Sequence, residues 1–287
     1  MLAPAMPEPH RPSPQQPCQP RHPHRRVAGG PTWLADGRVF RQMPWLVLAC
    51  SLNLPATAAE TRVAVAANFA APLAALTPGF TAATGHTLRI TPGATGKFYS
   101  QILAGAPFEV LLAADADTPQ RLIQQGHAVP GSALTYAIGH LVLWSPQPGL
   151  VDDQGAVLAA GRFSHLAIAN PKLAPYGLAA LAVLKARGLD QLLAPKLVTG
   201  ESLAQAHQFV ATGNAELGFV ALSQVAAPGK ALVGSLWRVP QSLYPPIRQD
   251  AVLLNPGRAN PAALALLAYL QSAPAKALIQ AWGYAAP

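Results

Sequence analysis

The stretch "TLRITPGATGKFYSQILAGAPFEVLLAAD", residues 87–115, contains a complete strand–helix–strand unit. Its first and last segments, "TLRITPG" and "FEVLLAAD", are typical of short strands, and "GKFYSQILAGA" between them has the apolar spacing of an amphipathic helix. A glycine-rich turn, "GATGK", joins the first strand to the helix. Such a turn presents backbone N–H groups and the positive end of the helix dipole, so it predicts an anion-binding site.

The turn does not match the nucleotide-binding P-loop. That motif has four residues between its first glycine and the Gly-Lys pair, followed by a Ser or Thr that ligates magnesium. Here two residues separate Gly93 from Gly96, and Phe98 occupies the position of the hydroxyl. The turn therefore predicts a site for some anion without identifying it, and we expect Lys97 to point to solvent.

Strand and helix patterns alternate along the rest of the chain as well. This order predicts an α/β fold in which parallel strands are covered by helices on both faces, with ligands at the carboxyl ends of the strands. We interpret the chain as two lobes, the second inserted into the first, with connecting strands at "AIGHLVLW" and "RQDAVLL". The predicted boundaries are 61–138 and 247–287 for lobe I and 139–246 for lobe II.

The composition is that of a folded protein without a nucleic-acid partner. With 287 residues, 51% of them hydrophobic and 11% charged, the chain can bury a sizeable core. Its net charge of +8 would suit nucleic-acid binding, but half of that charge comes from residues 1–59, where six basic residues face two acidic ones. The remaining basic residues are scattered among acids without clusters.

Residues 1–59 are interpreted as a disordered extension followed by a secretory signal peptide. The first part is rich in Pro, Gln, His and Arg and cannot bury enough apolar surface to fold. The segment "RVFRQMPWLVLACSLNLPATAAE" then has basic residues, a short apolar run and small residues suited to cleavage, which predicts secretion. Both cysteines, Cys18 and Cys50, lie in this region, so the rest of the chain has no disulfide or thiolate metal site. We do not expect lipid attachment at Cys50.

Five segments resemble, in order and spacing, the periplasmic molybdate-binding proteins of molybdate ABC transporters: "VAVAANFAAPLAAL", "GATGKFYSQILAGAPFEVLLAADADTPQRL", "AIANPKLAPYGLAA", "ATGNAELGFVALSQV" and "PIRQDAVLL". The resemblance covers residues 61–287. It implies a two-lobed periplasmic-binding-protein fold, each lobe a mostly parallel sheet flanked by helices, that closes on a tetrahedral oxyanion. It also implies a monomeric, non-enzymatic carrier that delivers molybdate or tungstate to a membrane permease and needs no cofactor.

The resemblance assigns the oxyanion site residue by residue. The motif after the first strand places Ala67 and Asn68 at the anion, and the glycine-rich turn places Thr95 there. In the second lobe, "APYG" places Tyr176 at the anion. The segment "GESLAQA" places Leu203 there, through its backbone N–H.

Two positions depart from part of the family. Some members have a tyrosine at the position of Ala221 and a small residue at that of Tyr176, and here the two are exchanged. We therefore infer that the Tyr176 hydroxyl faces the anion. Neutral donors of this kind can hold a dianion without a paired cation and without any direct bond from the protein to the metal atom. Donors alone favour a fully deprotonated anion over protonated phosphate, and cavity size would separate molybdate and tungstate from sulfate.

Other functions remain open at this point. The same fold could bind sulfate, thiosulfate or another small oxyanion. A periplasmic hydrolase is a second alternative, but the chain has no G-x-S-x-G elbow and "GES" at residues 200–202 is a weak substitute. A regulator's ligand-sensing domain would carry a DNA-binding motif ahead of the lobes. The histidines lack metal-ligand spacing, and we expect Asp115 and Asp117 to cap the following helix.

Overall fold

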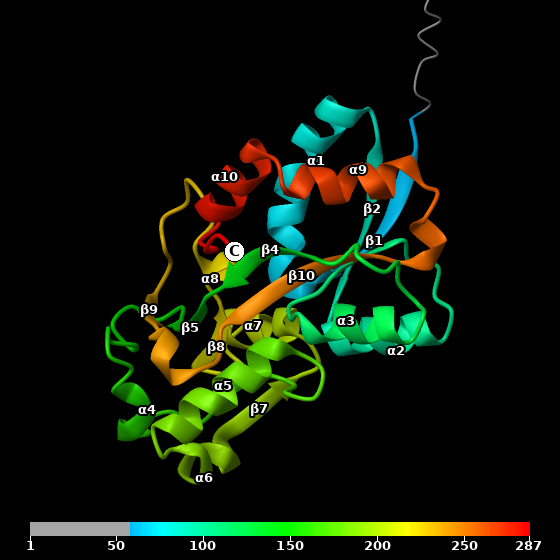
Figure 1. Cartoon of the computed structure of the whole chain (residues 1–287). Helices are drawn as coiled ribbons and strands as arrows, with labels where there is room; N and C mark the ends of the chain where they lie inside the picture. Colours follow the sequence, from blue (N-terminus) through cyan, green and yellow to red (C-terminus); the bar gives the residue numbers. More distant parts are fainter. Residues whose placement is uncertain (1–57) are drawn as a thin grey trace, which may run out of the picture. The chain divides into compact units, whose positions relative to one another are not determined.

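The structure, a computed structural model, describes residues 58–287. The predicted extension and signal peptide lie outside these residues except for positions 58 and 59, and Cys50 lies outside them too. Residues 58–287 form two five-stranded sheets, each flanked by helices (Figure 1). The predicted α/β class is therefore confirmed.

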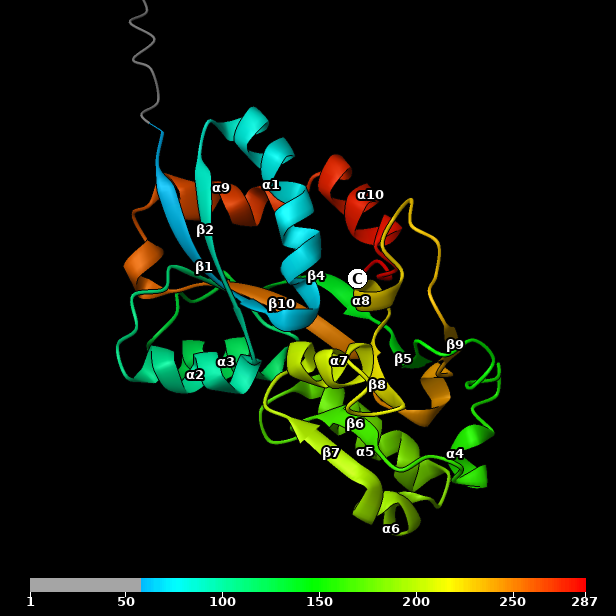
Figure 2. The same ribbon diagram turned by 180° about the vertical axis from the view of Figure 1, so that it is seen from behind.

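The first sheet has the strand order β2-β1-β3-β10-β4. Figures 1 and 2 show α1 and α9 on one face of this sheet and α2 and α3 on the other, while α10 packs against α1 and α9. The strands are β1 (Glu60–Ala66), β2 (Thr87–Gly93), β3 (Val110–Leu112), β4 (Leu134–Gly139) and β10 (Ile247–Leu253). The helices are α1 (Ala70–Thr84), α2 (Thr95–Leu103), α3 (Asp117–Gln124), α9 (Pro261–Leu270) and α10 (Ala273–Ala281).

The second sheet has the order β7-β6-β8-β5-β9. Helices α5 and α7 cover its opposite faces, as the two views in Figures 1 and 2 show. The strands are β5 (Leu141–Ser145), β6 (Leu166–Ala169), β7 (Leu197–Gly200), β8 (Leu217–Ala221) and β9 (Ser235–Arg238). The helices are α4 (Val157–Ala160), α5 (Pro175–Ala186), α6 (Asp190–Leu193), α7 (Leu203–Ala211) and α8 (Leu222–Val225). Short 3-10 helices lie at Ala67–Phe69, Ala194–Lys196, Gln241–Leu243 and Asn255–Gly257.

Each sheet is more mixed than the alternation of strands and helices predicts. In the first sheet β1 pairs in parallel with β2 and β3, but β10 runs antiparallel to β3 and β4. In the second, β6 is parallel to β7 and β8, but β5 is antiparallel to β8 and β9. The antiparallel pairings involve the strands next to the crossings between the sheets. Those strands are not built by a local strand–helix–strand unit, so their direction is not visible in the pattern.

The chain crosses from the first sheet to the second between β4 and β5, where a single residue, His140, separates the two strands. It returns through the segment between β9 and β10. The strands on either side belong to different sheets, which agrees in outline with the expected insertion of one lobe into the other. The residue boundaries of the lobes stay a prediction. The names lobe I and lobe II denote the elements around the first and the second sheet.

The core of each lobe is built from its sheet and the helices beside it. Strand β1 carries Val63, Ala64 and Val65, all fully buried, because both faces of the sheet are covered. Strand β5 is likewise buried at all five positions. Within residues 58–287 no single helix is long and apolar enough to cross a bilayer; α9 and α10 pass that test only as a pair, which is bent by 64°.

Helix α3 begins differently from the prediction. It starts at Asp117, but the side chain that accepts from its first turn is that of Asp115, whose Oδ1 receives the Thr118 N–H at 2.8 Å. Asp117 instead forms an ion pair with Arg121, one turn further along the helix. The predicted capping role is therefore correct for Asp115 and wrong for Asp117.

Candidate anion-binding site

The five residues predicted at the anion line one small cavity between the lobes. Its volume is about 10 Å³, so the two lobes lie close together around it. Its lining consists of Ala66, Ala67, Asn68, Gly93, Ala94, Thr95, Ala114, Ala174, Pro175, Tyr176 and Leu203.

Four helix starts meet at this cavity, two from each lobe. Ala67 begins the 3-10 helix that runs into α1, and Thr95 is the first residue of α2. Tyr176 is the second residue of α5, and Leu203 is the first of α7. The first turn of a helix leaves its N–H groups without partners inside the helix, and the helix dipole adds positive potential there. The cavity is therefore surrounded by N–H donors of the kind that bind anions.

Glycines allow two of these helix starts to approach the strands that precede them. A Cβ added at Gly177, in the first turn of α5, would overlap the carbonyl oxygen of Ala169 at the end of β6. A Cβ at Gly200, at the end of β7, would lie 2.6 Å from the backbone nitrogen of Ala206 in α7. Side chains at these two positions would push α5 and α7 away from the ends of their strands. The sequence patterns "PYG" and "VTG" thus contribute to the position of the N–H groups.

The Thr95 hydroxyl is oriented by one hydrogen bond. Thr95 is buried, and its Oγ1 accepts the N–H of Ala114 at 3.0 Å. Ala114 follows β3 and also lines the cavity. Because Oγ1 already accepts from Ala114, the hydroxyl hydrogen can be donated to a ligand in the cavity.

Asn68 differs from the expectation in the group that it offers. Both hydrogens of its carboxamide are used within the protein, since Nδ2 donates to Gln249 Oε1 at 2.8 Å and to the Tyr284 hydroxyl at 3.1 Å. Its backbone carbonyl oxygen accepts from the hydroxyls of Tyr284 and Ser223. The donor that remains for a ligand is the backbone N–H at the start of the helical run.

Tyr176 is almost completely buried and lines the cavity. Its hydroxyl oxygen accepts a hydrogen bond from Gln249 Nε2 at 3.1 Å, so the hydroxyl hydrogen is still available for donation. Burial raises the pKa of this phenol well above its ordinary value, and the nearby Tyr284 and Tyr136 act in the same direction. The hydroxyl therefore stays protonated at any physiological pH. Ala221, the other position of the exchange, does not line the cavity.

Among the described residues, no charged side chain lines the cavity. Lys97, in the first turn of α2, forms an ion pair with Glu201 of the other lobe. Lys97 is about half exposed, so the prediction that it points to solvent is correct in part. The hydrogen bond and charge of Lys97 lower the pKa of Glu201, which keeps this carboxylate ionised. A second interlobe contact lies next to it, where the Gly96 N–H donates to the Leu173 carbonyl at 2.9 Å.

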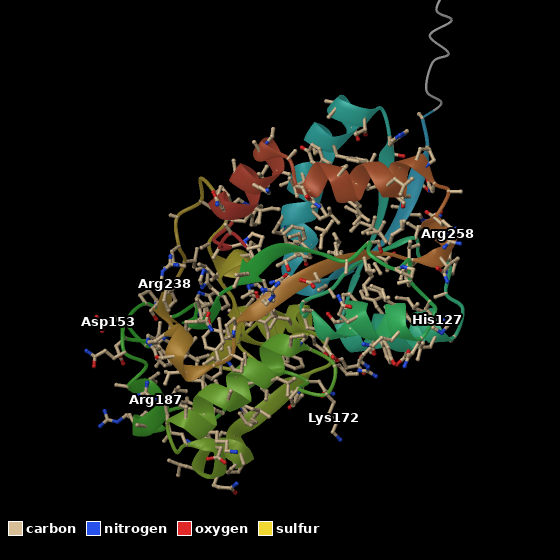
Figure 3. The ribbon with its side chains drawn as sticks, in the orientation of Figure 1. His127, Asp153, Lys172, Arg187, Arg238 and Arg258 are labelled. Atoms are coloured by element: carbon tan, nitrogen blue, oxygen red, sulfur yellow. The ribbon has the colours of Figure 1, made fainter. Side chains whose placement is uncertain are left out.

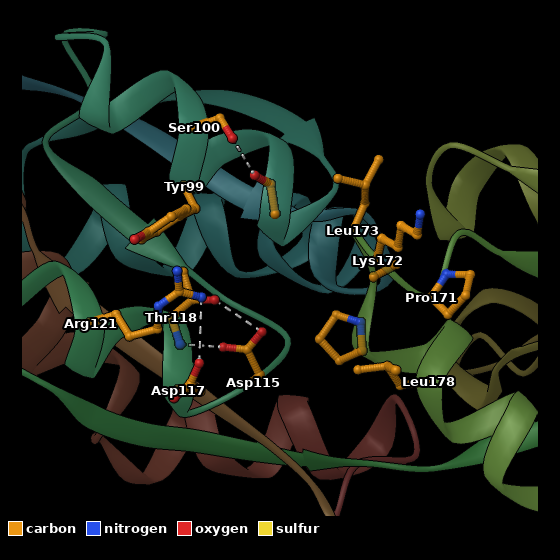
Figure 4. Close-up of a pocket in the computed structure, with 13 residues that line it drawn as sticks. Tyr99, Ser100, Asp115, Asp117, Thr118, Arg121, Pro171, Lys172, Leu173 and Leu178 are labelled. Atoms are coloured by element: carbon orange, nitrogen blue, oxygen red, sulfur yellow. Dashed lines mark hydrogen bonds and ion pairs between the residues drawn. The ribbon is translucent and has the colours of Figure 1, made fainter.

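A larger groove of about 360 Å³ lies between α2, α3 and the segment before α5 (Figure 4). Asp115 and Asp117 line it, together with Arg121, which is paired with Asp117. Burial raises the pKa of Asp115, although the hydrogen bonds from Thr118 oppose that shift. Lys172 also lines the groove, so two carboxylates and two cations share it and its charges give no net preference for an anion. The converging helix starts make the small cavity the better anion site.

Within residues 58–287, no group of three or more His, Cys, Asp or Glu side chains could hold a metal ion. Ser202 of the "GES" segment caps α7, because its Oγ accepts the Gln205 N–H at 3.3 Å. This serine therefore has the structural role of a helix cap. Figure 3 labels His127, Asp153, Lys172, Arg187, Arg238 and Arg258, whose side chains lie at the periphery of the fold.

Sequence reasoning missed the polar residues behind the cavity. Gln249, Tyr136, Tyr284 and Ser223 are all buried and joined by hydrogen bonds to Asn68, to Tyr176 or to one another. A signal was available for one of them. Gln249 lies in the predicted strand "RQDAVLL", and an amide that such a strand buries needs partners inside the protein.

A small cavity between two α/β lobes, with donors from both lobes, is typical of a solute-binding protein that closes on its ligand. The chain belongs to the family described as bacterial extracellular solute-binding protein, whose profile matches residues 61–285. It is 59% identical over 238 residues to the molybdate-binding protein ModA of Azotobacter vinelandii, with 83% of this chain and 93% of that protein covered. The identity to the molybdate-binding protein ModA of Rhodobacter capsulatus is 53% over 239 residues, with the same coverage.

A solved structure agrees with the described fold. The Azotobacter vinelandii periplasmic molybdate-binding protein matches this chain with a TM-score of 0.77 and 43% identity, covering 79% of this chain and 99% of that one. The two-lobed periplasmic-binding-protein fold that the sequence predicts is therefore confirmed.

Proposed function

We propose that this protein captures molybdate in the cavity between its lobes and delivers it to the permease of an ABC transporter. The observation that carries the proposal is the convergence of four helix starts on a small cavity whose lining, among the described residues, has no charged side chain. The high identity to two molybdate-binding proteins narrows the class of anion. Export to the periplasm, a monomeric state and the absence of catalysis are parts of the same proposal.

In this proposal the anion accepts hydrogen bonds from Ala67, Asn68, Thr95, Tyr176 and Leu203. Ala67, Asn68 and Leu203 act through backbone N–H groups, and Thr95 adds its hydroxyl. Tyr176 offers its N–H at the start of α5 and its phenol hydrogen. The ligand's metal atom is reached only through its own oxygens, with no bond from a protein atom.

Donor chemistry supports a tetrahedral dianion. A protonated oxyanion carries an O–H that needs an acceptor, and a site built from N–H and O–H donors leaves that hydrogen unpaired at a cost of about 1–3 kcal/mol. Phosphate carries such a hydrogen near neutral pH, whereas molybdate, tungstate and sulfate do not. Discrimination against sulfate then depends on size, because the donors of two lobes can contact all the oxygens of only one size of anion.

Isothermal titration calorimetry of the mature protein with molybdate, tungstate, sulfate, thiosulfate and phosphate tests the function. We expect one site per chain, with molybdate and tungstate bound far more tightly than the other anions. Tight binding of sulfate or thiosulfate with weak binding of molybdate would contradict the proposal and indicate a binding protein for another small oxyanion. The absence of binding to all five anions would refute it.

The affinity for molybdate should not depend on pH between about 6.5 and 9. Of the described residues that line the cavity, Tyr176 alone carries a titratable side chain, and its pKa is raised well above the ordinary value of a phenol. The phenol is therefore protonated throughout this range, and no donor is gained or lost. Calorimetric titrations at three pH values check this expectation, which a change of more than about threefold in affinity would contradict.

Replacing Lys97 by Met should accelerate molybdate release by a small factor and leave its capture rate unchanged. The Lys97–Glu201 ion pair joins the lobes, but both side chains are exposed, and exposed pairs contribute little. Stopped-flow fluorescence at low and high salt measures the effect, which should shrink as salt screens the pair in the parent protein. Lys172→Met, on a side chain directed outward (Figure 3), is the control. Equal release rates for parent and Lys97→Met at low salt would show that the ion pair does not hold the lobes together around the ligand.

A further inference from the structure

Gln249 lies at the centre of a buried hydrogen-bond network behind the cavity. It belongs to β10, the strand that re-enters lobe I after the chain leaves lobe II, and it is fully buried. The pairing of β10 with β4 shifts register between Gln249 and Asp250. Such a bulge re-aims the side chain beside it. A fully buried amide is costly unless its polar atoms are paired, so its partners define its role.

The amide oxygen of Gln249 connects it to the cavity residues of lobe I. Oε1 accepts from Asn68 Nδ2 at 2.8 Å and lies 3.0 Å from the Tyr136 hydroxyl. The same hydroxyl donates to the carbonyl of Ala113 at 2.9 Å, so the two oxygens share its single hydrogen. The peptide that follows Ala113 supplies the N–H that orients the Thr95 hydroxyl. Gln249 is thus linked to both polar residues that lobe I contributes.

The amide nitrogen of Gln249 connects it to the cavity residue of lobe II. Nε2 donates to the Tyr176 hydroxyl at 3.1 Å, which joins residues that are 73 positions apart. Gly139 makes this contact possible, because a Cβ at that position would overlap the Tyr176 hydroxyl and lie 2.5 Å from Gln249 Nε2. Gly139 is also the last residue of β4, just before the chain crosses into lobe II.

We propose that Gln249 is a positioning residue for the oxyanion site, holding Asn68 of lobe I and Tyr176 of lobe II in the geometry that binds the anion. The proposal rests on the proposed function. Gln249 does not line the cavity, so its effect passes through these two residues. Because its two amide ends bond to different lobes, it stabilises the closed arrangement specifically. Loss of the amide should therefore shorten the lifetime of the bound state more than it slows capture.

The first test replaces Gln249 by Met, which keeps the volume and removes the amide. We expect molybdate release to become about tenfold faster, with the association rate within about twofold of the parent, in stopped-flow tryptophan fluorescence. Thr135→Val is the matched control, because it removes a hydrogen bond to the neighbouring Asp250 and leaves the network intact. Its release rate should equal that of the parent. An unchanged release rate in Gln249→Met, or equal acceleration in both variants, would overturn the proposal.

A second variant gives a readout that a merely structural role would not produce. In Gln249→Glu a protonated carboxyl can imitate the amide, whereas the ionised form loses the donor to Tyr176 and adds negative charge near the anion. A buried carboxyl has a raised pKa, so this variant should release molybdate progressively faster between pH 6 and 9 while the parent stays constant. A release rate independent of pH in Gln249→Glu would count against the proposal even if Gln249→Met folds poorly.

A double-mutant cycle tests the coupling between the lobes. If Gln249 acts through Tyr176, then Gln249→Met should accelerate release less in a Tyr176→Phe background than in the parent. Additive effects of the two changes would overturn this link. The parent titration separates the two levels of inference: a parent that binds no oxyanion refutes the proposed function, whereas a parent that binds molybdate with an unaffected Gln249→Met variant refutes the positioning role alone.

Discussion

Gly177→Ala is expected to lower the affinity for molybdate by about 100-fold. The added Cβ overlaps the carbonyl oxygen of Ala169, a backbone atom at the end of β6 that cannot rotate away. Helix α5 must therefore shift, and it carries the Tyr176 N–H and hydroxyl with it. Loss of two hydrogen bonds to a charged ligand, at about 1.5 kcal/mol each, corresponds to a factor of this size.

The design of this variant separates binding from helix formation. Gly177 lies inside α5, where alanine is the better helix former by about 1 kcal/mol, so any loss comes from the collision and not from the helix itself. Leu178→Ala is the control, because that side chain is 60% exposed on the same turn. Calorimetry on both variants measures the difference. Parent-like affinity in Gly177→Ala would mean that α5 can retreat without moving the donors.

Thr95→Val is expected to weaken molybdate binding by about 1–3 kcal/mol and to destabilise the protein as well. Valine has nearly the same shape but offers no hydrogen to the anion. It also leaves the buried Ala114 N–H without its acceptor, which costs about 1–3 kcal/mol of folding free energy. The variant should therefore show both a lower affinity and a lower melting temperature without ligand.

Thr95→Ser distinguishes the loss of the hydroxyl, which lowers both the molybdate affinity and the folding stability, from a general loss of packing. Serine keeps the hydroxyl that accepts from Ala114 and donates to the ligand, so it should retain most of the affinity. Titration calorimetry and thermal unfolding of the three proteins give the answer. If Val and Ser bind molybdate equally well, the hydroxyl faces away from the anion and Thr95 contributes only its backbone N–H.

Among residues 58–287 no cation lines the cavity, which suits the proposed capture and release of an anion. Removing a dianion from water is expensive unless hydrogen bonds replace its hydration shell, and the converging helix starts supply such bonds from two lobes. Because each lobe supplies only part of the set, an opened protein holds the anion by fewer donors. The interlobe contacts of Lys97 with Glu201 and of Gln249 with Tyr176 therefore bear on the lifetime of the complex.

Most of the local structure can be predicted from the sequence. Residues 87–115 are predicted as strand, helix and strand, and β2, α2 and β3 lie there, although β3 is shorter than expected. Helix starts depend on local features such as Pro175 and the Ser202 cap. For this reason the motifs before the helices indicate cavity residues that do lie together. Their contact with an anion stays a prediction, as do the lobe boundaries.

Contacts between residues that are far apart in the sequence depend on the tertiary structure. The directions of β5 and β10 are set by pairing with strands far away in the chain. The carboxamide of Asn68 faces Gln249, 181 positions away, so its backbone N–H is the donor left for the anion. Lys97 meets Glu201 across 104 positions. Local propensity and periodicity report on neighbours within a few turns, whereas these contacts exist only after segments far apart in the chain have folded together, and no local pattern records them.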